Sequence, residues 1–105
     1  MKLLKIDSSN FEKEVLNFSG TTIVLFTAPW CPACQEQYKI LVDFVNFKNN
    51  SKFCFVDIDV SPDLVDYYEI KMIPVSFIFE SGALVDVKNQ ILSYSDLDKI
   101  MHCVT

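Results

Sequence analysis

The sequence predicts an α/β fold in which helices cover both faces of a mixed β-sheet. Segments with strand patterns and segments with helix patterns alternate along the chain in the order β-α-β-α-β-α-β-β-α. Alternating units of this kind form a sheet with helices on its two faces. The last two strands follow each other across a short turn, which favours a hairpin and makes the sheet a mixed one.

Length and composition indicate one globular domain over residues 1–105. A chain of this size forms a single hydrophobic core, because cores divide into domains only at greater length. Half of the residues are hydrophobic and 22% are charged, a balance that supports a large core. The two Gly and four Pro are few, so we expect short connections between the elements.

The chain begins with a strand pattern and a helix pattern. Residues 2–6 form a short apolar run, which predicts a strand. Residues 11–18 place apolar side chains at helical spacing, which predicts a helix. Ser8 and Ser9 are the candidate N-caps of this helix, and Gly20 is expected to end it.

The middle of the chain contains two strands with a helix between them. Residues 21–28 are rich in β-branched side chains and almost continuously apolar, as in a central strand covered on both faces. Residues 33–48 repeat apolar positions at spacings of three and four, which predicts a helix that ends in a turn at Asn49 and Asn50. Residues 52–60 alternate and are rich in Phe and Val, so we expect another strand there.

Residues 61–70 carry the signals of a short helix. Ser61 is the candidate N-cap, and Pro62 occupies the first helical position, where its missing N–H has no partner to lose. Asp63 follows near the positive end of the helix dipole. These residues predict that the helix begins directly after Ser61.

The last third of the chain predicts a hairpin and a closing helix. Residues 75–80 and 83–88 have strand patterns and are separated by Ser81 and Gly82, which are typical turn residues. Ser95 is expected to cap a helix over residues 96–104.

The charge and the apolar runs exclude several classes of function. A net charge of −5 argues against a nucleic-acid partner and against an anionic membrane surface, because both require a basic face. The longest apolar runs have the length of strands and fall short of the ~20 residues of a membrane helix. Asp7 interrupts the N-terminus before a signal sequence develops. We therefore expect a cytoplasmic monomer without a membrane partner.

Cys31 and Cys34 are the strongest candidates for chemistry. They stand where a predicted strand meets a predicted helix, and reactive sites usually lie at such carboxyl ends of strands. With Cys31 as N-cap and Pro32 at the first helical position, the N–H groups of Ala33 and Cys34 point at the Cys31 sulfur and favour its thiolate. Cys34 lies one turn deeper within disulfide distance, so it is expected to be the less exposed thiol.

A metal site and inert core cysteines are the alternatives for this pair. Zinc needs two further ligands, and the remaining candidates, Cys54, His102 and Cys103, form no second paired motif. We therefore expect no metal. Cys54 is interpreted as a core residue, and His102 as an exposed side chain of the terminal helix. The acidic run over residues 56–63 lacks the Gly and the final Glu of a calcium loop and is interpreted as a solvated strand end and helix cap.

The segment FTAPWCPACQ over residues 26–35 resembles the active-site segment of the thioredoxin family, which usually reads WCGPCK. KMIPVSFIFESG over residues 71–82 resembles the second hallmark of that family, an Ile-Pro before the hairpin. The resemblance covers the whole chain and implies the thioredoxin fold, a three-layer α/β/α arrangement with a mixed central sheet. It also implies that Pro74 is a cis-proline facing the disulfide, and that Trp30 and the Ile73 backbone hold a substrate polypeptide.

Several positions depart from the family pattern. The family keeps a buried Asp and a Lys beneath the inner cysteine, and the matching residues here are Leu25 and Phe55. The absence of both charges together is physically consistent, because an Asp or a Lys alone at these positions would be a buried, unpaired charge at a cost of ~3–5 kcal/mol. Without a group to accept its proton, Cys34 is expected to be activated late, so that the mixed disulfide persists. Gln90 replaces a Gly that usually opens the substrate groove, which predicts a narrower groove, and Lys39 in place of a Pro predicts a straighter helix.

The resemblance implies thiol–disulfide exchange, in which Cys31 attacks as a thiolate and Cys34 resolves the mixed disulfide. The substrates are protein disulfides, no cofactor is needed beyond the Cys31–Cys34 pair, and electrons come from a thioredoxin-reductase-type enzyme or another dithiol. Two alternatives stay open. The fold can serve as a docking module with incidental cysteines. The dipeptide Pro32-Ala33 places a Pro directly after the first cysteine, as in glutaredoxins and oxidants of the superfamily, which is compatible with a disulfide oxidase or isomerase.

Overall fold

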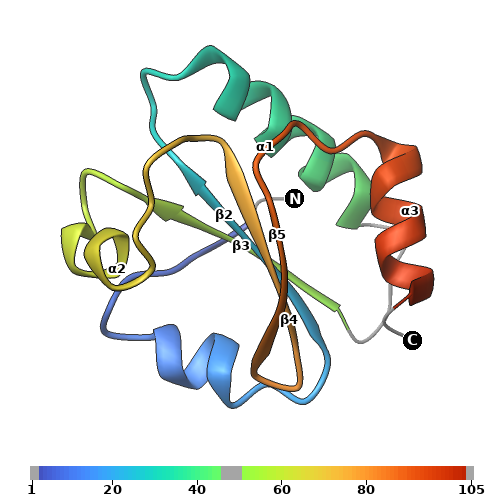
Figure 1. Ribbon diagram of the computed structural model, residues 1–105, viewed down its shortest axis with the longest axis horizontal. Coiled ribbons are helices and arrows are strands. Elements are labelled where there is room, and N and C mark those ends of the chain that lie inside the picture. The colour runs from blue at the N-terminus through green and yellow to red at the C-terminus, as the bar shows by residue number, and fades with distance from the viewer. Residues whose placement is uncertain (1–2, 46–50, 104–105) are drawn as a thin grey trace.

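The computed structural model describes residues 3–45 and 51–103, and its centre is a five-stranded sheet (Figure 1). The strands lie in the order β1-β3-β2-β4-β5. They are β1 (Leu4–Lys5), β2 (Thr21–Thr27), β3 (Ser51–Asp57), β4 (Val75–Glu80) and β5 (Ala83–Lys88). Because β2 is parallel to β3 and antiparallel to β4, the sheet is mixed, as the sequence predicts.

Helices cover both faces of this sheet, which confirms the predicted three layers. The helical elements are η1 (Glu12–Leu16), α1 (Pro32–Val45), α2 (Pro62–Tyr67) and α3 (Tyr94–Cys103). α1 and α3 lie on one face, where their residues Leu41 and Leu97 join one core cluster. η1 and α2 lie on the opposite face, where Val15 and Leu64 join a second cluster. Among the helices of residues 3–45 and 51–103, none has the length and hydrophobicity of a membrane-spanning segment.

β2 is the central strand, and all of its residues are buried. Its side chains alternate between the two core clusters, with Ile23 and Leu25 on the α1 side and Val24 and Phe26 on the other. A strand that is buried on both faces requires an almost continuous apolar sequence, which is the pattern of residues 21–28. Because β2 leads directly into α1, the segment between them starts from a rigid strand.

The helix after β1 is shorter than predicted over residues 11–18. η1 begins at Glu12 and ends at Leu16. The Asn17 N–H donates to the Glu12 carbonyl oxygen (2.9 Å), which is the bond of a π-helix. The helix therefore ends before Gly20, which lies directly before β2.

Ser8 and Ser9 do not cap η1, so the predicted N-caps are wrong. The Asp7 carboxylate accepts the Ser9 N–H (2.8 Å) and the Ser9 hydroxyl. The Ser8 hydroxyl donates to the carboxylate of Asp63, at the start of α2. Both serines bond to nearby carboxylates, which are stronger acceptors than neutral groups, and η1 begins without a side-chain cap.

The caps of two later helices also differ from expectation. α3 begins before Ser95, so the predicted cap at Ser95 is wrong. Instead, Ser93 Oγ accepts the Asp96 N–H (3.1 Å) and Asp96 Oδ2 accepts the Ser93 N–H (2.9 Å), a reciprocal capping pair. Ser61 precedes α2 as predicted, but its side chain makes no capping bond.

β4 and β5 have the bounds that residues 75–80 and 83–88 predict. α1 begins at Pro32, the first helical position that the capping pattern predicts, one residue before the apolar repeat over residues 33–48. Its predicted end at residue 48 and the turn at residues 49–50 lie outside the described residues.

β3 and α2 end earlier than predicted. The N–H groups of Val60 and Ser61 both donate to the Asp57 carbonyl oxygen (3.0 and 3.1 Å), so a turn replaces the last three residues of the predicted strand. α2 ends at Tyr67, and Glu69 has a positive φ of 53°, which is incompatible with a continuing right-handed helix.

Candidate active site

The segment between β2 and α1 holds the two cysteines at the N-terminus of a helix. The Cys31 N–H donates to the Ala28 carbonyl oxygen (3.2 Å), which closes a tight turn after the strand. The Cys31 carbonyl oxygen accepts the Gln35 N–H (3.1 Å), the first hydrogen bond of α1. Cys31 is therefore the N-cap and Pro32 the first helical residue, as the sequence predicts.

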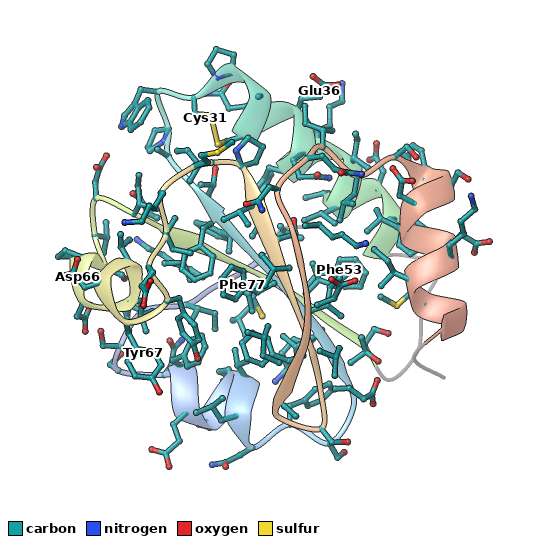
Figure 2. All side chains as sticks on the ribbon, viewed as in Figure 1. Cys31, Glu36, Phe53, Asp66, Tyr67 and Phe77 are labelled. Carbon is teal, nitrogen blue, oxygen red and sulfur yellow. A yellow bond between two sulfur atoms is a disulfide. The ribbon has the colours of Figure 1, made fainter. Side chains whose placement is uncertain are left out.

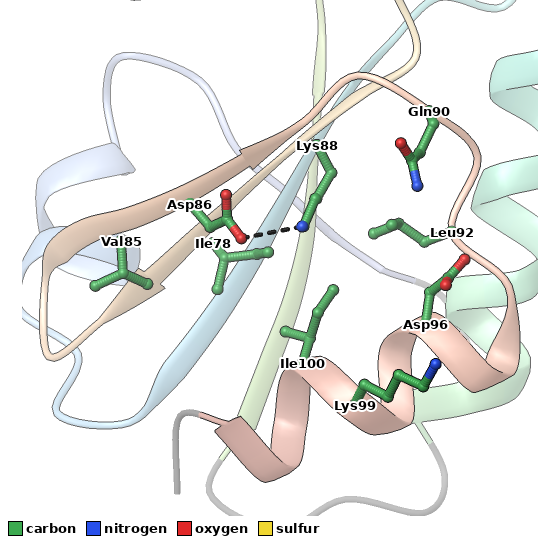
Figure 3. Close-up of a pocket in the computed structure, with 9 residues that line it drawn as sticks. All are labelled: Ile78, Val85, Asp86, Lys88, Gln90, Leu92, Asp96, Lys99 and Ile100. Atoms are coloured by element: carbon green, nitrogen blue, oxygen red, sulfur yellow. Dashed lines mark ion pairs between the residues drawn. The ribbon is translucent and has the colours of Figure 1, made fainter.

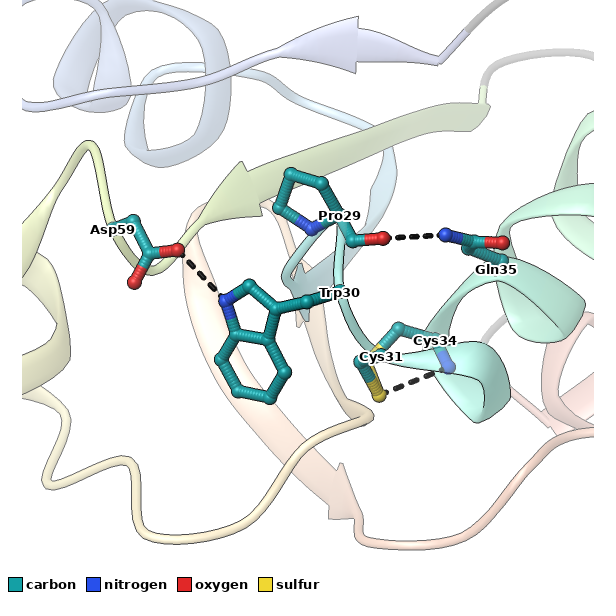
Figure 4. The surroundings of a disulfide bond; sticks show 6 residues. All are labelled: Pro29, Trp30, Cys31, Cys34, Gln35 and Asp59. Atoms are coloured by element: carbon teal, nitrogen blue, oxygen red, sulfur yellow. Dashed lines mark hydrogen bonds between the residues drawn. A yellow bond between two sulfur atoms is a disulfide. The ribbon is translucent and has the colours of Figure 1, made fainter.

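Cys31 and Cys34 form a disulfide across the first turn of α1 (Figure 4). Their Cα atoms are 5.2 Å apart, within the range that a disulfide requires. The Cys34 N–H donates to Cys31 Sγ (3.2 Å). Cys31 is 8% exposed and Cys34 is 0% exposed, so Cys34 is the deeper of the two, as expected. When the disulfide is open, this N–H and the positive end of α1 favour a thiolate at Cys31.

The peptide bond between Ile73 and Pro74 is cis, which confirms the expectation from the family resemblance. β4 starts at the next residue, where Val75 pairs with Phe26 near the end of β2. The antiparallel pairing therefore brings the cis-proline near the C-terminal end of β2, and the segment with the disulfide follows that end. The Ile73 side chain packs against the buried cluster that contains both cysteines.

Trp30 is held in place by a residue that the sequence analysis did not assign to the site. Its indole is 64% exposed, and Nε1–H donates to Asp59 Oδ2 (2.9 Å), as Figure 4 shows. Asp59 is in turn positioned by its own N–H, which donates to Asp57 Oδ1 (2.9 Å). The sequence interpretation of the acidic run, a solvated strand end and helix cap, assigns Asp59 no role in the site. Asp57 and Asp59, two residues apart at the end of a predicted strand, could have indicated a polar group near the site. The local sequence does not indicate that Asp59 binds Trp30, which lies 29 residues away in the chain.

Leu25 and Phe55 form an apolar floor beneath α1. They are register partners on β2 and β3. Leu25 is fully buried, and the Phe55 ring meets the Tyr38 ring edge-on with centroids 5.4 Å apart. A hollow of about 200 Å³ beside this floor is also lined by Asp57, at the end of β3. The site therefore sits on apolar side chains at the two positions where the family keeps a charge pair.

The third described cysteine, Cys54, is buried in the core, as expected. Burial raises the pKa of its thiol to about 12, so it stays protonated near neutral pH. His102 and Cys103 belong to the last turn of α3, and their side chains lie outside the described residues. Within the described part of the chain, no three His, Cys, Asp or Glu residues gather as metal ligands would.

Gln90 lines a hollow between β5 and α3 (Figure 3). The floor of this hollow is apolar and includes Leu92 and Ile100, and Lys88 pairs with Asp86 at its rim (3.2 Å). The expected effect of Gln90 on a substrate groove therefore stays a prediction.

A disulfide across the first turn of a helix, with a cis-proline on the neighbouring strand of a mixed sheet, defines a protein of the thiol–disulfide oxidoreductase class. The family model described as Thioredoxin matches residues 2–103, and the chain belongs to the thioredoxin family. A thioredoxin of Porphyra purpurea is 31% identical over 88 residues, which cover 82% of this chain and 81% of the relative. Thioredoxin 1 of Nostoc sp. is 30% identical over 84 residues, covering 79% and 78%.

A solved structure shares the fold. A mutant thioredoxin from Halobacterium salinarum superposes with a TM-score of 0.86 over 99% of this chain and 91% of that chain. The two sequences are 18% identical, so this likeness is evidence for the thioredoxin fold alone.

Proposed function

We propose that this protein reduces disulfides in other proteins. The observation that carries the proposal is the asymmetry of the pair, since Cys31 at the helix N-terminus is 8% exposed while Cys34 behind it is fully buried. Cys31 is the thiol that keeps some access to solvent, so once ionised it can reach the disulfide of a large substrate. A buried thiol is reserved for the internal step that follows.

The reaction proceeds through two exchanges. The Cys31 thiolate attacks one sulfur of the substrate disulfide, a Cys31–substrate bond forms, and the other substrate sulfur leaves as a thiolate that takes a proton. Cys34 then loses its proton and attacks Cys31 Sγ. The second substrate thiol is released, and the two electrons gained by the substrate leave a Cys31–Cys34 disulfide.

Trp30, Ile73 and Pro74 form the substrate contact in this proposal. The Trp30 indole is exposed, and its bond to Asp59 keeps it beside the cysteines. Ile73 precedes the first residue of β4, so its backbone lies outside that strand and can pair with an extended substrate. Pro74 is buried and cis, which fixes this corner.

The proposal extends to the state of the protein, its location and its source of electrons. One thioredoxin-like domain over residues 1–105 acts as a cytoplasmic monomer. No metal or organic cofactor takes part, because the Cys31–Cys34 pair carries both electrons. A thioredoxin-reductase-type flavoenzyme or another dithiol returns the electrons to the pair.

Insulin reduction tests the proposal. The wild type is expected to reduce insulin disulfides, and Cys31→Ser to lose this activity. Cys34→Ser is expected to accumulate a mixed disulfide with substrate, while Cys54→Ala serves as a cysteine control distant from the exchange. Equal activity of the wild type and Cys31→Ser would instead indicate a docking module with incidental cysteines.

A redox titration against glutathione decides the direction of the exchange. Thioredoxins have potentials near −270 mV and strong oxidants near −120 mV, a span that separates the two roles clearly. We expect a value in the reducing part of this range. A value near the oxidising end would assign the protein to disulfide formation, as the Pro32 position in the dipeptide allows.

A further inference from the structure

A buried hydroxyl on β4 lies beneath the cysteine pair and makes no hydrogen bond. Ser76 is fully buried, and within the part of the chain that the structure describes its Oγ has no partner. Burying a hydroxyl without a partner is unfavourable, and folded proteins keep few such groups. An unpaired hydroxyl next to a reactive pair is therefore a candidate for a role in the reaction.

The strand pairing directs the Ser76 side chain toward α1. Its neighbour Val75 belongs to the core cluster on the η1 side, and successive side chains of a strand point to opposite faces. Its register partner Leu25 belongs to the cluster on the α1 side. Because β4 begins at Val75, Ser76 is the first residue of this strand that points toward α1.

Cys34 points at the same part of the sheet from the helix above it. Gln37 and Tyr38 follow Cys34 by three and four residues, so the three side chains share one face of α1. The Tyr38 ring meets the Phe55 ring on β3, and Gln37 exchanges two hydrogen bonds with the backbone of Leu92, which follows β5. β2 and β4 lie between β3 and β5 in the sheet, so Cys34 lies over β2 and β4.

The packing of Cys34 agrees with this placement. It belongs to one buried cluster with Ala28, directly after β2, and Ile73 packs against that cluster from the segment before β4. Figure 2 shows Cys31, in the same cluster, beside the start of β4. Along β4, Ser76 is therefore the α1-facing side chain nearest to the cysteines.

Opening of the disulfide offers this hydroxyl a partner. In the oxidised pair, Cys34 Sγ is bonded to Cys31 Sγ and carries neither a proton nor a charge. In the reduced pair, Cys34 is a thiol that can donate a hydrogen bond, and in the resolving step it is a thiolate that accepts one. Hydrogen bonds to charged groups are stronger than those between neutral groups, so the thiolate gains most.

We propose that Ser76 is a further catalytic residue of the exchange, and that its hydroxyl bonds Cys34 Sγ whenever the disulfide is open. In the resolving step, the Cys34 thiol releases its proton to water, and the Ser76 hydroxyl keeps its own proton and donates a hydrogen bond to the thiolate. The thiolate attacks Cys31 Sγ, the bond between Cys31 and the substrate breaks, and the substrate sulfur leaves with the electron pair. The inference rests on the proposed function, because it assigns a role in the resolving step of that exchange.

Other titratable groups lie on the elements packed around Cys34, and none of them is changed in the test below. They are Cys31, Tyr38, Asp57, Asp59 and Lys88. Lys88 is the register partner of Ser76 on β5, and its ammonium pairs with Asp86 (3.2 Å). A difference between the wild type and a Ser76 variant therefore reports the hydroxyl.

Stopped-flow reaction of the reduced protein with dithiobis(nitrobenzoate) tests the inference, in a Cys54→Ala/Cys103→Ala background so that only the pair reacts. The first thiolate released reports attack by Cys31, and the second reports its displacement by Cys34. The second phase is expected to accelerate with pH, and its midpoint to lie about one pH unit higher in Ser76→Ala, as for one lost hydrogen bond to a charged group. Below the midpoint, the thiolate is about tenfold rarer but more nucleophilic, so we expect release to be about threefold slower.

The redox equilibrium gives a second readout that moves in the opposite sense. In the proposal, the Ser76 hydroxyl has a partner in the dithiol and none in the disulfide, so it favours the dithiol. Ser76→Ala is therefore expected to shift a titration against glutathione about twofold to fivefold toward the disulfide, as for one neutral hydrogen bond. The variant is then the stronger reductant at equilibrium and the slower one in releasing its substrate.

Thr22→Val is the matched control. Among the described residues, the Thr22 hydroxyl is also buried without a partner. Its neighbour Ile23 points to the α1 side, so Thr22 points away from Cys34. We expect Thr22→Val to keep the wild-type midpoint and redox equilibrium. A Ser76→Ala midpoint equal to that of the wild type, or an equal shift in Thr22→Val, would overturn the inference.

Failure of the proposed function is distinguishable from failure of the inference. If the wild type reduces no insulin, the reductase proposal fails, while the nitrobenzoate reaction still compares Ser76→Ala with the wild type, because it needs only the two cysteines. If insulin is reduced and the midpoints of the two proteins coincide, the role of Ser76 fails and the proposed function stands.

Discussion

A charge introduced at Leu25 tests the reasoning about the apolar floor of the site. Leu25 is fully buried, and its register partner Phe55 supplies no charge to pair with a carboxylate. Leu25→Asp therefore removes a buried leucine, worth about 1.5–3 kcal/mol, and buries an unpaired charge at about 3–5 kcal/mol. The expected loss of unfolding free energy is about 5–8 kcal/mol, a large share of the stability of a small domain.

Urea unfolding of the oxidised protein measures this loss. Leu25→Ala is the control, because it creates a cavity without a charge and is expected to cost about 2–5 kcal/mol. Adding Phe55→Lys to Leu25→Asp is expected to restore at least about 2 kcal/mol, since the two side chains are then opposite charges on neighbouring strands. The reasoning would be refuted if Leu25→Asp cost no more than Leu25→Ala, or if the second substitution rescued nothing.

The same variant makes a prediction about pH. Burial raises the pKa of a carboxyl placed at Leu25, because it disfavours the charged form. The folded state then holds a proton that the unfolded chain has already lost, so stability falls as the pH rises above about 4. We expect a smaller loss for Leu25→Asp at pH 4 than at pH 8.

Three further predictions concern the cysteines and the indole. If Cys34 is activated late, stopped-flow release of the mixed disulfide accelerates from neutral to alkaline pH, whereas a fast, pH-independent release would reject this idea. Asp59→Ala, which frees the Trp30 indole, is expected to lower kcat/KM about threefold to tenfold with a stability change under about 1 kcal/mol, and an unchanged kcat/KM would argue against a positioning role. Because its raised pKa keeps the buried Cys54 protonated, iodoacetamide at pH 8 is expected to label reduced Cys31 rapidly and Cys54 only after unfolding.

The sequence predicted well those elements whose apolar pattern or turn residues mark their ends. β2 is apolar on both faces, and the hairpin strands have clear turn residues between them, so their bounds were predicted to within one residue. The position of the cysteine pair at the start of α1 was predicted equally well, because an N-cap residue followed by a Pro has a defined local geometry. In each of these cases, the residues that form the structure and the residues that predict it lie within a few positions of each other in the chain.

The N-cap predictions failed because other partners, some local and one far along the chain, compete for the same polar groups. Ser8, Ser9 and Ser95 all have the chemistry of N-caps. Ser8 instead donates to Asp63, Ser9 donates to Asp7, and Ser93 with Asp96 caps α3 in place of Ser95. Propensity ranks these residues as caps without deciding which of several neighbours makes the bond.

By itself, the sequence determined the order of the elements, the central buried strand and the position of a cysteine pair at a helix N-terminus. Hydrophobic period, turn chemistry and capping are local, so a single chain segment is enough to express them. Tertiary structure alone decided that Asp59 holds the indole of Trp30 and that the cis Ile73–Pro74 bond lies near the end of β2, where the disulfide segment begins. These contacts join residues far apart in the chain, and they exist only because strand pairing and core packing bring several elements to one edge of the sheet.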